Sequence, residues 1–365
     1  MKYFDAFSGI GGFSKGIIQA HEFNRNPNVQ KERGRAKTPK GVYEKRKRLH
    51  PVPSETTVSI KDWDNEHTNG STDEGQPNCV GSSEIDKYAI QIYKKHFPTH
   101  KNYGDITAID TATLPDFDCF VGGFPCQAFS IAGKRRGFED TRGTLFFECA
   151  RIIRDKRPRT FVLENVKGLL SHEKGETFKT IIRTLTELGY CVEWQVLNSK
   201  NFGVPQNRER VFIVGHLRGS SGRKIFPIFG GSKKAYGTSL NQINNNAADA
   251  QRIYDSNGDP SFTLTSQDRH GVLIHSLYPR SSKTNKGGTG HLTKQDNTAY
   301  CLDTGNMQAV EKDFRIRRLT PTECERLQGF PDGWTEGLSD TQRYKCLGNA
   351  VTVNVIEAIF KKLIK

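Results

Sequence analysis

One cysteine, Cys126, stands where a nucleophile is expected. It follows an apolar run that stops at two glycines, in the segment VGGFPCQAFSIAGKRR at positions 121–136, and it begins a polar and basic loop. A cysteine thiolate is strongly nucleophilic, and a few per cent of thiolate near neutral pH is enough for covalent chemistry. The sequence therefore offers Cys126 as a candidate for covalent catalysis.

Charged side chains that could assist this thiol stand near two other strand ends. Glu164 ends the apolar run 160–163, and a carboxyl group there can hold or donate a proton. In the segment FGVPQNRERVFIVG, Gln206, Arg208 and Arg210 alternate, so they share one side if the chain is extended. Guanidinium groups bind carbonyl and phosphate oxygens with fixed geometry, or they form ordinary salt bridges.

A glycine turn near the start of the chain and a later acidic residue indicate a nucleotide-like ligand. The apolar run 2–7 ends in SGIGG, where Gly9 and Gly11 allow the backbone to approach a ligand at a helix N-terminus. The turn is not the dinucleotide fingerprint, because the third glycine would fall at Ser14, and a simple tight turn is the alternative. Glu84 ends a later strand, where an acidic residue accepts hydrogen bonds from ribose hydroxyls; a surface carboxylate is the alternative.

Short apolar runs alternate with amphipathic segments over the first 217 residues. The predicted strands are 2–7, 79–86, a short strand ending at 103–106, 118–121, 160–163, 191–197 and 211–215, and the predicted helices include 87–97, the segment after the Cys126 loop and 176–188. This alternation predicts an α/β fold with a doubly wound, mostly parallel sheet, whose ligands bind beyond the carboxyl ends of the strands. Cys126, directly after the strand 118–121, would lie at that edge, with Glu164 one strand away.

The composition favours a polyanionic partner. The 365 residues carry a net charge of +14 with a pI near 9.4, which points to nucleic acid, with a generally basic surface as the alternative. The eight cysteines form no CxxC pair and no cluster with histidines, so we expect neither a metal site nor a disulfide framework. The start MKYFDAFSGI has no signal-peptide core, and no window approaches the ~20 apolar residues of a membrane span. A soluble, cytoplasmic protein is expected.

Two segments depart from the alternating pattern. Residues 24–77 are polar, basic in the first half and mostly acidic in the second, and we expect a partly flexible insertion. Its run 45–48 is similar to a nuclear-import patch, a motif with many false positives. After residue 217 Gly, Ser, Asn and Lys dominate, and SFTLTSQDRHGV at 261–272 aligns weakly with AYCLDTGNMQAV at 299–310. This change predicts a second, smaller domain of short strands and loops.

The C-terminal part of the chain has a helical pattern. The pattern changes at Arg315, and Thr320 can cap a helix that Pro321 opens. A last helix follows LGNAV, and its apolar stripe consists of Val351, Val355, Ile359 and Leu363.

Nine motifs occur together in one order. They are DAFSGIGGFSKG at the start, SSEID at Glu84, GDI at Asp105, GGFPCQAFS around Cys126, RGTLFFE from Arg142, LENV at Glu164, FGVPQNRERVFIVG around Arg208, RRLTPTECERLQGFPDGW and LGNAVTVNV. With these motifs the sequence resembles the DNA (cytosine-5) methyltransferase family, in particular its prokaryotic and phage modification enzymes. The resemblance covers nearly the whole chain except the segments 24–77 and 217–314.

The resemblance implies a Rossmann-like, S-adenosylmethionine-dependent methyltransferase domain and a smaller target-recognition domain, with double-stranded DNA between them. The catalytic domain would comprise residues 1–217 and 335–365, including the insertion 24–77, and the recognition domain residues 218–334. The C-terminal helix would pack back onto the catalytic domain. A monomer without a metal or a membrane partner is expected, and a companion restriction endonuclease is compatible with the resemblance.

The same resemblance assigns roles to individual residues. The expected reaction transfers a methyl group from S-adenosylmethionine to C5 of a flipped-out cytosine in a specific duplex sequence. Cys126 adds to C6 to form a covalent adduct, Glu164 stabilises N3, and Arg208 and Arg210 hold the base carbonyl, the cysteine-bearing region or a phosphate. The expected cofactor contacts are Phe7, Gly9, Gly11, Gly12, Glu84, Ile85, Asp105, Ile106, Pro125, Leu145 and Asn349.

DNA contacts are expected in two regions. The segment 127–144 would close over DNA as a mobile loop. The expected contacts are Gln127, Ser130, Arg135 and Arg136, together with Gln206, and the expected base readers are Gln267, Arg269, Asn306 and Gln308. The DNA sequence that is read stays open. Two alternatives also stay open: an RNA substrate for the same chemistry, or a catalytically silent DNA-binding homologue, which the intact Cys126 and Glu164 disfavour.

Overall fold

The computed structural model describes residues 1–26, 76–125, 145–220, 222–230, 273–276, 292–294, 299–302, 304, 308–312 and 315–364. Eight predicted site residues lie outside these ranges: Cys126, Gln127, Ser130, Arg135, Arg136, Gln267, Arg269 and Asn306. Most of the predicted insertion lies outside them as well.

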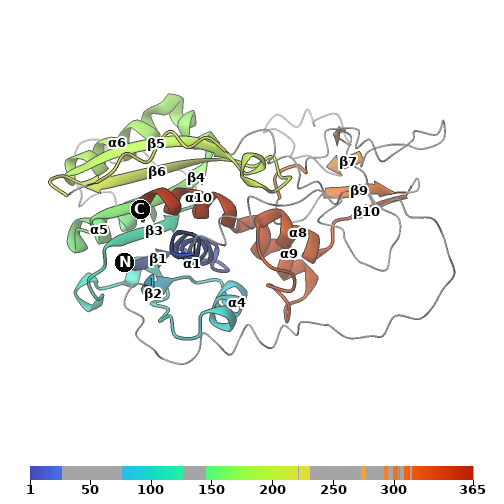
Figure 1. Cartoon of the computed structure of the whole chain (residues 1–365), viewed down its shortest axis with the longest axis horizontal. Coiled ribbons are helices and arrows are strands. Elements are labelled where there is room, and N and C mark those ends of the chain that lie inside the picture. Colours follow the sequence, from blue (N-terminus) through green and yellow to red (C-terminus); the bar gives the residue numbers. More distant parts are fainter. Residues whose placement is uncertain are drawn as a thin grey trace.

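A six-stranded sheet forms the centre of the larger part of the molecule (Figure 1). In spatial order its strands are β2 (Asn78–Ser83), β1 (Lys2–Ala6), β3 (Cys119–Gly123), β4 (Thr160–Val166), β6 (Glu209–Leu217) and β5 (Tyr190–Asn198). Within this sheet β6 alone runs against the other strands, because it pairs antiparallel with both β4 and β5. The mostly parallel sheet predicted from the alternating pattern is confirmed.

The predicted strand ending at 103–106 is wrong. There the chain makes an isolated bridge between Asn102 and Ser82, and the short 3-10 helix η1 (Ile106–Ala108) follows. The Asn102 side chain bonds the backbone of Glu84 twice: Oδ1 accepts from the N–H, and Nδ2 donates to the carbonyl oxygen, each at 3.1 Å. These side-chain bonds take the place of a backbone ladder, so pairing stops after one bridge.

Helices cover both faces of the large sheet. On one face α1 (Gly12–Arg25) and α10 (Val353–Leu363) share an apolar core with the strands beneath them. On the other face α5 (Leu145–Lys156) and α6 (Glu176–Glu187) do the same. Figure 1 shows α1 and α10 side by side although they come from opposite ends of the chain. The C-terminal helix therefore packs back onto the sheet, as the resemblance implied.

A third group of helices shares its own apolar cluster. This group consists of α4 (Lys87–His96), α8 (Pro321–Gln328) and α9 (Asp340–Asn349). In Figure 1, α8 and α9 lie between the large sheet and the strands β7, β9 and β10. The helices thus connect the two sheets of the molecule.

The second sheet is antiparallel. Its strands in spatial order are β10 (Arg315–Arg318), β9 (Gln308–Lys312), β7 (Leu273–Ser276) and β8 (Leu292–Lys294). The helical pattern predicted from Arg315 is therefore wrong at its start: Arg and Ile alternate with period two there, and this stretch pairs with β9. The helix begins at Pro321, and Thr320 caps it in a capping box with Glu323, which confirms the predicted cap.

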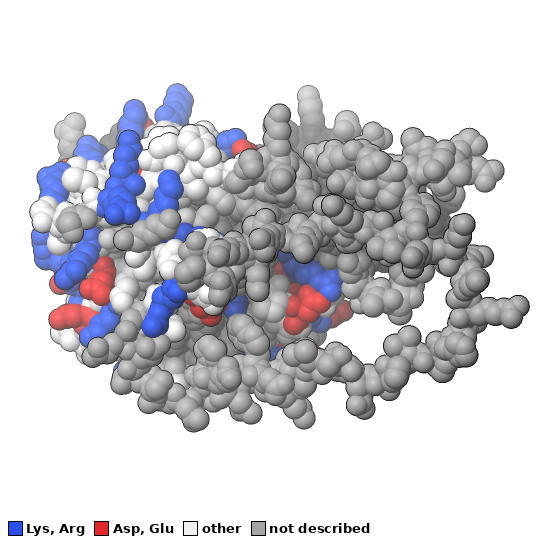
Figure 2. Space-filling view, in the orientation of Figure 1, with Lys and Arg blue, Asp and Glu red and all other residues white. Residues whose placement is uncertain are grey.

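Basic side chains predominate on one face of the described part of the molecule. Figure 2 shows more Lys and Arg than Asp and Glu side chains on the described part of one face, chiefly over the large sheet. No described helix is long and apolar enough to cross a membrane. Nor do the described residues hold a group of three or more His, Cys, Asp or Glu side chains placed to bind a metal ion.

Candidate active site

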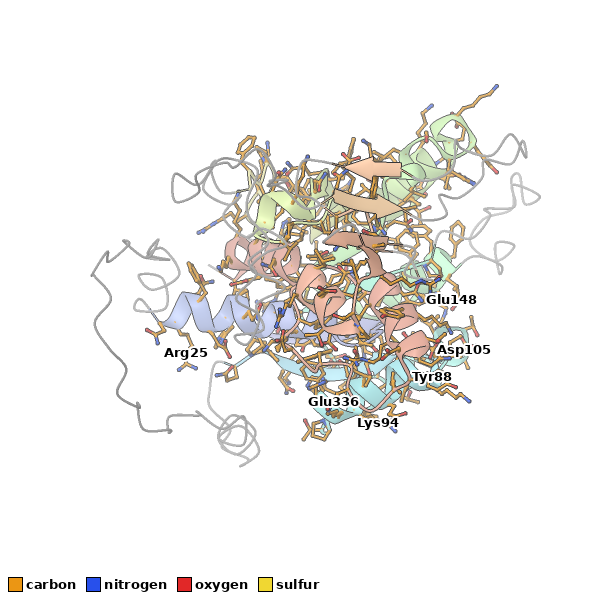
Figure 3. All side chains as sticks on the ribbon, turned by 90° about the vertical axis from the view of Figure 1, so that its right-hand side faces the viewer. Arg25, Tyr88, Lys94, Asp105, Glu148 and Glu336 are labelled. Carbon is orange, nitrogen blue, oxygen red and sulfur yellow. The ribbon has the colours of Figure 1, made fainter. Side chains whose placement is uncertain are left out.

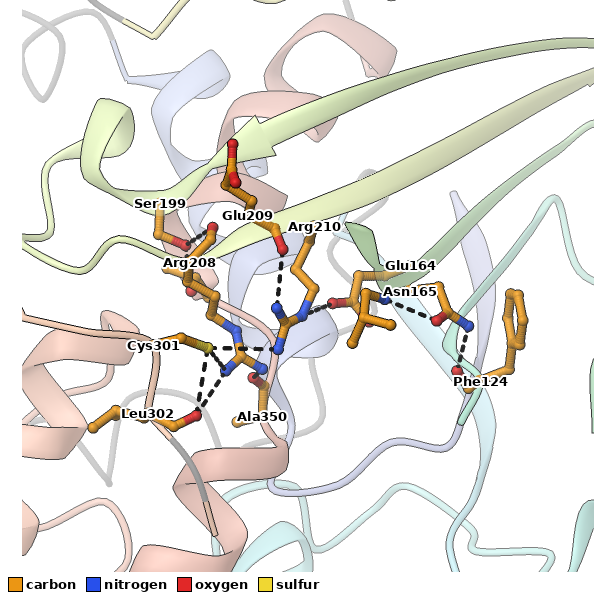
Figure 4. Close-up of polar contacts among 12 residues, drawn as sticks. Phe124, Glu164, Asn165, Ser199, Arg208, Glu209, Arg210, Cys301, Leu302 and Ala350 are labelled. Atoms are coloured by element: carbon orange, nitrogen blue, oxygen red, sulfur yellow. Dashed lines mark hydrogen bonds and ion pairs between the residues drawn. The ribbon is translucent and has the colours of Figure 1, made fainter. Parts of the chain in front are cut away.

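The carboxylate of Glu164 and the guanidinium of Arg210 form an ion pair at the edge of the large sheet (Figure 4). Arg210 Nε lies 3.0 Å from Glu164 Oε1, and the two side chains are 17% and 12% exposed. They meet because β6 pairs antiparallel with β4, which brings the start of β6 beside the end of β4. A pair shielded this well interacts more strongly than one on the open surface, yet both side chains keep some contact with solvent.

Glu164 also lies next to the strand that leads to Cys126. Glu164 and Gly123 are register partners across β4 and β3, so the predicted neighbour relation of these strands is confirmed. A side chain at position 123 would crowd the carboxylate, because a Cβ there would lie 3.0 Å from Glu164 Oε2. Beyond β3, Asn165 Nδ2 donates to the carbonyl oxygen of Phe124 at 2.9 Å. This bond fixes the backbone just before position 126.

Arg208 has a different environment from Arg210. It is 3% exposed, and its Nη2 donates to the carbonyl oxygens of Gly348 at 3.2 Å and Ala350 at 2.8 Å. Burial, and then the nearby charge of Arg210, lower the pKa of Arg208. Arg208 therefore holds interior backbone groups on both sides of Asn349, whereas Arg210 faces the carboxylate.

Two residues expected to contact DNA lie in the interior. Gln206 and Gln308 are 0% and 1% exposed. Gln206 Nε2 donates to the carbonyl oxygen of Leu327 in α8 at 2.9 Å, and its Oε1 accepts from the N–H of Leu302 at 3.0 Å. Gln308 Nε2 donates to the carbonyl oxygen of Cys301 at 2.7 Å. In this structure both amides hold backbone segments together, and neither is presented to DNA.

The Glu84 carboxylate, directly after β2, is held by three backbone N–H groups. Its Oε2 accepts from Gly9 at 2.9 Å, and its Oε1 accepts from Ile85 and from Asp86, each at 2.9 Å. Gly9 can take part because it adopts a left-handed φ of 53°, which an L side chain rarely adopts. The predicted acidic residue is thus joined to the predicted glycine turn.

The other residues expected to bind the cofactor divide between the surface and the interior. Ile85 is 72% exposed, which is unusual for a large apolar side chain, and Asp105 and Asn349 are exposed too. Ile106 is buried instead, with 2% exposure. The remaining residues of this set are Phe7, Gly11 and Gly12 in or just after the turn, Pro125 after β3, and Leu145 at the start of α5.

Figure 3 shows on which side of the molecule these residues lie. In Figure 3, Asp105 and Tyr88 lie on the side opposite Arg25, the last residue of α1. The N-terminus of α1, which carries positive partial charge, therefore points toward the side where Asp105 lies. Ser8 in the turn adds a polar group there, because its Oγ is buried and has no hydrogen-bond partner among the described residues.

The buried Asp5, beneath the glycine turn, was not predicted as a functional residue from the sequence. Asp5 is 0% exposed, and its Oδ2 accepts hydrogen bonds from Ser14 Oγ at 2.8 Å and from the Tyr93 hydroxyl at 3.4 Å. Burial raises the pKa of Asp5 from its ordinary value of 3.8 to about 7. The one available signal was a charged residue within the apolar run at the start of the chain.

Comparison with known proteins identifies the family. A family model described as C-5 cytosine-specific DNA methylase matches residues 68–365, so the chain belongs to that family. It is 44% identical over 294 residues to the Type II methyltransferase M1.ScrFI of Lactococcus lactis subsp. cremoris, covering 78% of this chain and 72% of that protein. It is 41% identical over 301 residues to the Type II methyltransferase M.HpaII of Haemophilus parainfluenzae, covering 79% and 83%.

Solved structures show the same fold. A mutant of Spodoptera frugiperda DNMT2 matches with a TM-score of 0.59 at 18% identity, covering 100% of this chain and 99% of that one. A putative DNA modification methyltransferase encoded within an E. coli prophage matches with a TM-score of 0.58 at 16% identity, again covering 100% and 99%. The Rossmann-like methyltransferase fold is confirmed, and with the family match it makes the chain a DNA (cytosine-5) methyltransferase.

Proposed function

We propose that this methyltransferase acts on C5 of a cytosine that is flipped out of double-stranded DNA, through a covalent bond between Cys126 Sγ and C6. The observation that carries the proposal is the Glu164–Arg210 ion pair. Glu164 is in register with Gly123, three residues before Cys126. An acid, a guanidinium and a thiol from three strand ends can thus surround one base.

The chemistry explains why these groups are needed together. C5 of cytosine is a weak nucleophile, and forming an S–C6 bond with the Cys126 thiolate pushes the ring electrons toward N3. Glu164, when protonated, places its proton at N3 and so stabilises the enamine that results. When bound, S-adenosylmethionine supplies the electrophilic methyl group. Water takes up the C5 proton as the S–C6 bond breaks, and the N3 proton returns to the Glu164 carboxylate, which restores the neutral aromatic ring and the free thiolate.

Arg210 and Arg208 have different proposed roles in the reaction. Arg210 orients the Glu164 carboxyl group through its Nε, and it is the guanidinium placed near solvent to bind the carbonyl of the base. Arg208, anchored in the interior, supports the turn around Asn349. We therefore infer that Arg208 acts through its neighbours and that Arg210 touches the base.

The residues near the carboxyl ends of β1 and β2 are suited to bind S-adenosylmethionine. The Glu84 carboxylate is fixed by backbone groups and carries the charge needed to accept two ribose hydroxyls. The exposed Ile85 offers an apolar surface for the adenine, and Asp105 stands nearby with its carboxylate for the adenine edge. The Ser8 hydroxyl, which has no partner within the described ranges, offers a hydrogen bond for the polar end of the ligand.

DNA recognition is proposed for residues 218–334, with the catalytic domain formed by 1–217 and 335–365. The segment 127–144 is proposed to close over the flipped base. Several relatives are named Type II methyltransferases, which favours modification of DNA within a restriction-modification system and a companion endonuclease. The net charge of +14 suits a polyanionic substrate.

A mechanism-based trap tests the covalent step. The protein is incubated with S-adenosylmethionine and duplexes in which 5-fluorocytosine replaces cytosine, because fluorine at C5 blocks release of the enzyme. We expect the wild type to form an adduct that survives denaturing electrophoresis, and Cys191→Ala, which removes an exposed thiol, to form it equally. Cys126→Ser should form none while it still binds DNA. A wild type without adduct, under conditions in which it methylates DNA, overturns the mechanism.

The target and the nature of the nucleic acid are settled by a second measurement. Bisulfite sequencing of a plasmid from cells that express the protein should show one short sequence methylated at a single cytosine. A structured RNA of the same sequence serves as the competing substrate in vitro. Methyl transfer to that RNA and not to the duplex would replace the DNA proposal, and transfer to neither would favour a silent DNA-binding homologue.

A further inference from the structure

Cys301 contacts both arginines of the site, and nothing in the sequence pointed to it. Its sulfur lies 3.3 Å from Arg208 Nη1 and 3.7 Å from Arg210 Nη2, and both nitrogens donate hydrogen bonds to it (Figure 4). The thiol in turn donates to the carbonyl oxygen of Leu302 at 3.5 Å. One partly buried thiol therefore bridges two guanidinium groups.

The contact with sulfur completes the set of restraints on Arg210. Its Nε bonds Glu164 at 3.0 Å, its Nη1 donates to the carbonyl oxygen of Glu209 at 2.9 Å, and its Nη2 donates to Cys301. Each of the three nitrogens thus has a different partner. Because a planar guanidinium turns as one body, loss of the sulfur contact would let the group rotate away from the carboxylate.

The sulfur itself stands in a fixed place. The carbonyl oxygen of Cys301 accepts a 2.7 Å bond from the buried amide of Gln308, and the next N–H, that of Leu302, donates to the buried amide of Gln206. Leu302 is 4% exposed in the apolar cluster below. The backbone is held on both sides of the thiol, so its position is set before substrate arrives.

The two guanidinium groups need such an acceptor between them. Like charges this close repel, and the repulsion is stronger away from bulk water. Burial and then the charge of Arg210 lower the pKa of Arg208, whereas the Cys301 sulfur and the Glu164 carboxylate raise it. Glu164 and Cys301 are therefore the groups that offset the repulsion, one on each side of Arg210.

We propose that Cys301 is a positioning residue for methyl transfer: its sulfur links Arg210 to the anchored Arg208 and keeps Arg210 turned toward Glu164. The inference rests on the proposed function of the Glu164 site. It predicts a specific role for a side chain within the proposed recognition domain, residues 218–334, so that this domain and the catalytic pair are joined through one thiol.

The test compares Cys301→Ala with Cys301→Ser, and uses Cys191→Ala as the matched control. Adduct formation on the 5-fluorocytosine duplex is followed in a single turnover, together with the KM for S-adenosylmethionine and the thermal midpoint. Cys301→Ala removes the acceptor shared by Arg208 and Arg210, and loss of the bond to Arg210 should slow adduct formation about 10-fold, with the KM for S-adenosylmethionine unchanged. The serine hydroxyl can accept the same bonds, so Cys301→Ser should recover most of the rate.

Three outcomes overturn the inference. Unchanged adduct formation in Cys301→Ala would show that the sulfur does not position Arg210. Equal losses of rate in both variants, in step with a lowered thermal midpoint, would show a packing role alone. A wild type that forms no adduct would remove the proposed function and this inference with it, whereas an active wild type with unaffected variants would remove the inference only.

Discussion

Two carboxylates stand at the same edge of the large sheet and are held in opposite ways. Glu84, after β2, accepts from three backbone N–H groups in adjoining turns. Glu164, on β4, depends on one guanidinium, Arg210, which depends in turn on the sulfur of Cys301. The cofactor end of the site, around Glu84, is thus built from local backbone geometry. The base end, around Glu164 and Arg210, is built from a series of side-chain contacts between distant segments. A single substitution should therefore disturb the base end more widely.

The largest effect is expected from Arg210→Ala. It removes the partner of Glu164 and the group proposed to bind the base carbonyl, and such donors contribute about 10²- to 10³-fold to rate. Folding should lose less than catalysis does, because Arg210 and Glu164 both keep some contact with solvent, which moderates the cost of leaving the carboxylate unpaired. Single-turnover methylation and thermal unfolding check both statements, with Arg218→Ala, just beyond the other end of β6, as the control. A loss of less than about 5-fold would place the base carbonyl elsewhere.

The same comparison explains what the sequence could and could not predict. The turn at Gly9 and the acid at Glu84 follow strands directly, so local pattern predicted both features; the bond between them follows from the pairing of β1 with β2. The ion pair needed the register of β4 and β6, and only the identities of Glu164 and Arg210 were predicted. No sequence pattern indicated a role for Cys301, because that role arises from the backbone hydrogen bonds that hold it beside two arginines from another segment.

Burial likewise separated residues that one motif had grouped. Gln206, Arg208 and Arg210 alternate along the chain, and alternation predicts a shared side but not what that side faces. The structure shows that Gln206 and Arg208 bond the interior around α8 and the α9–α10 turn, and that Arg210 reaches the rim. Gln206 and Arg208 are buried and Arg210 is not because the C-terminal helices pack against one part of this segment. No local sequence pattern predicts that packing.

The second largest effect is expected from Arg208→Met, which keeps the volume and removes the charge. The carbonyl oxygen of Gly348 would lose the Arg208 donor, and that of Ala350 would keep the longer bond from Gln328 Nε2 at 3.3 Å, at a cost of about 3 kcal/mol in the free energy of unfolding. Because these groups flank Asn349, affinity for S-adenosylmethionine should fall as well. Urea unfolding and equilibrium binding of the cofactor measure the two losses. A variant as stable as the wild type, with a lowered rate only, would make Arg208 a direct partner of the base instead.

A smaller and more selective effect is expected from Glu84→Gln. The amide keeps the shape of the carboxylate but loses its charge, so ribose hydroxyls are held less tightly, and affinity for S-adenosylmethionine should fall about 10-fold. The adduct rate at saturating cofactor should stay near the wild-type value, because the base end is untouched. Glu187→Gln, on the exposed end of α6, is the control. Unchanged cofactor binding would exclude Glu84 from the ribose site.

The smallest expected effect concerns the buried acid of the cofactor end. Asp5 has a raised pKa of about 7, so the folded protein holds a proton that the unfolded chain has released above its ordinary pKa of about 4. The contribution of this group to stability is complete below pH 4 and is lost as the pH rises through 7. Between pH 6 and 7 the wild type should lose about 1 kcal/mol of unfolding free energy relative to Asp5→Asn, whose amide does not titrate.

His100 also titrates near Asp5, because both side chains contact the Tyr93 hydroxyl. The predicted quantity is therefore the difference in unfolding free energy between the wild type and Asp5→Asn. Its Nδ1 lies 3.1 Å from the Tyr93 hydroxyl, and burial lowers its pKa to about 4. A lowered pKa stabilises the fold above the ordinary histidine value and loses that contribution as the pH falls, so His100 opposes Asp5 in this window. Both proteins keep His100, and its contribution cancels in the difference. Parallel stability profiles for the two proteins would mean that Asp5 is ionised in the fold, and that the turn above it carries a buried negative charge.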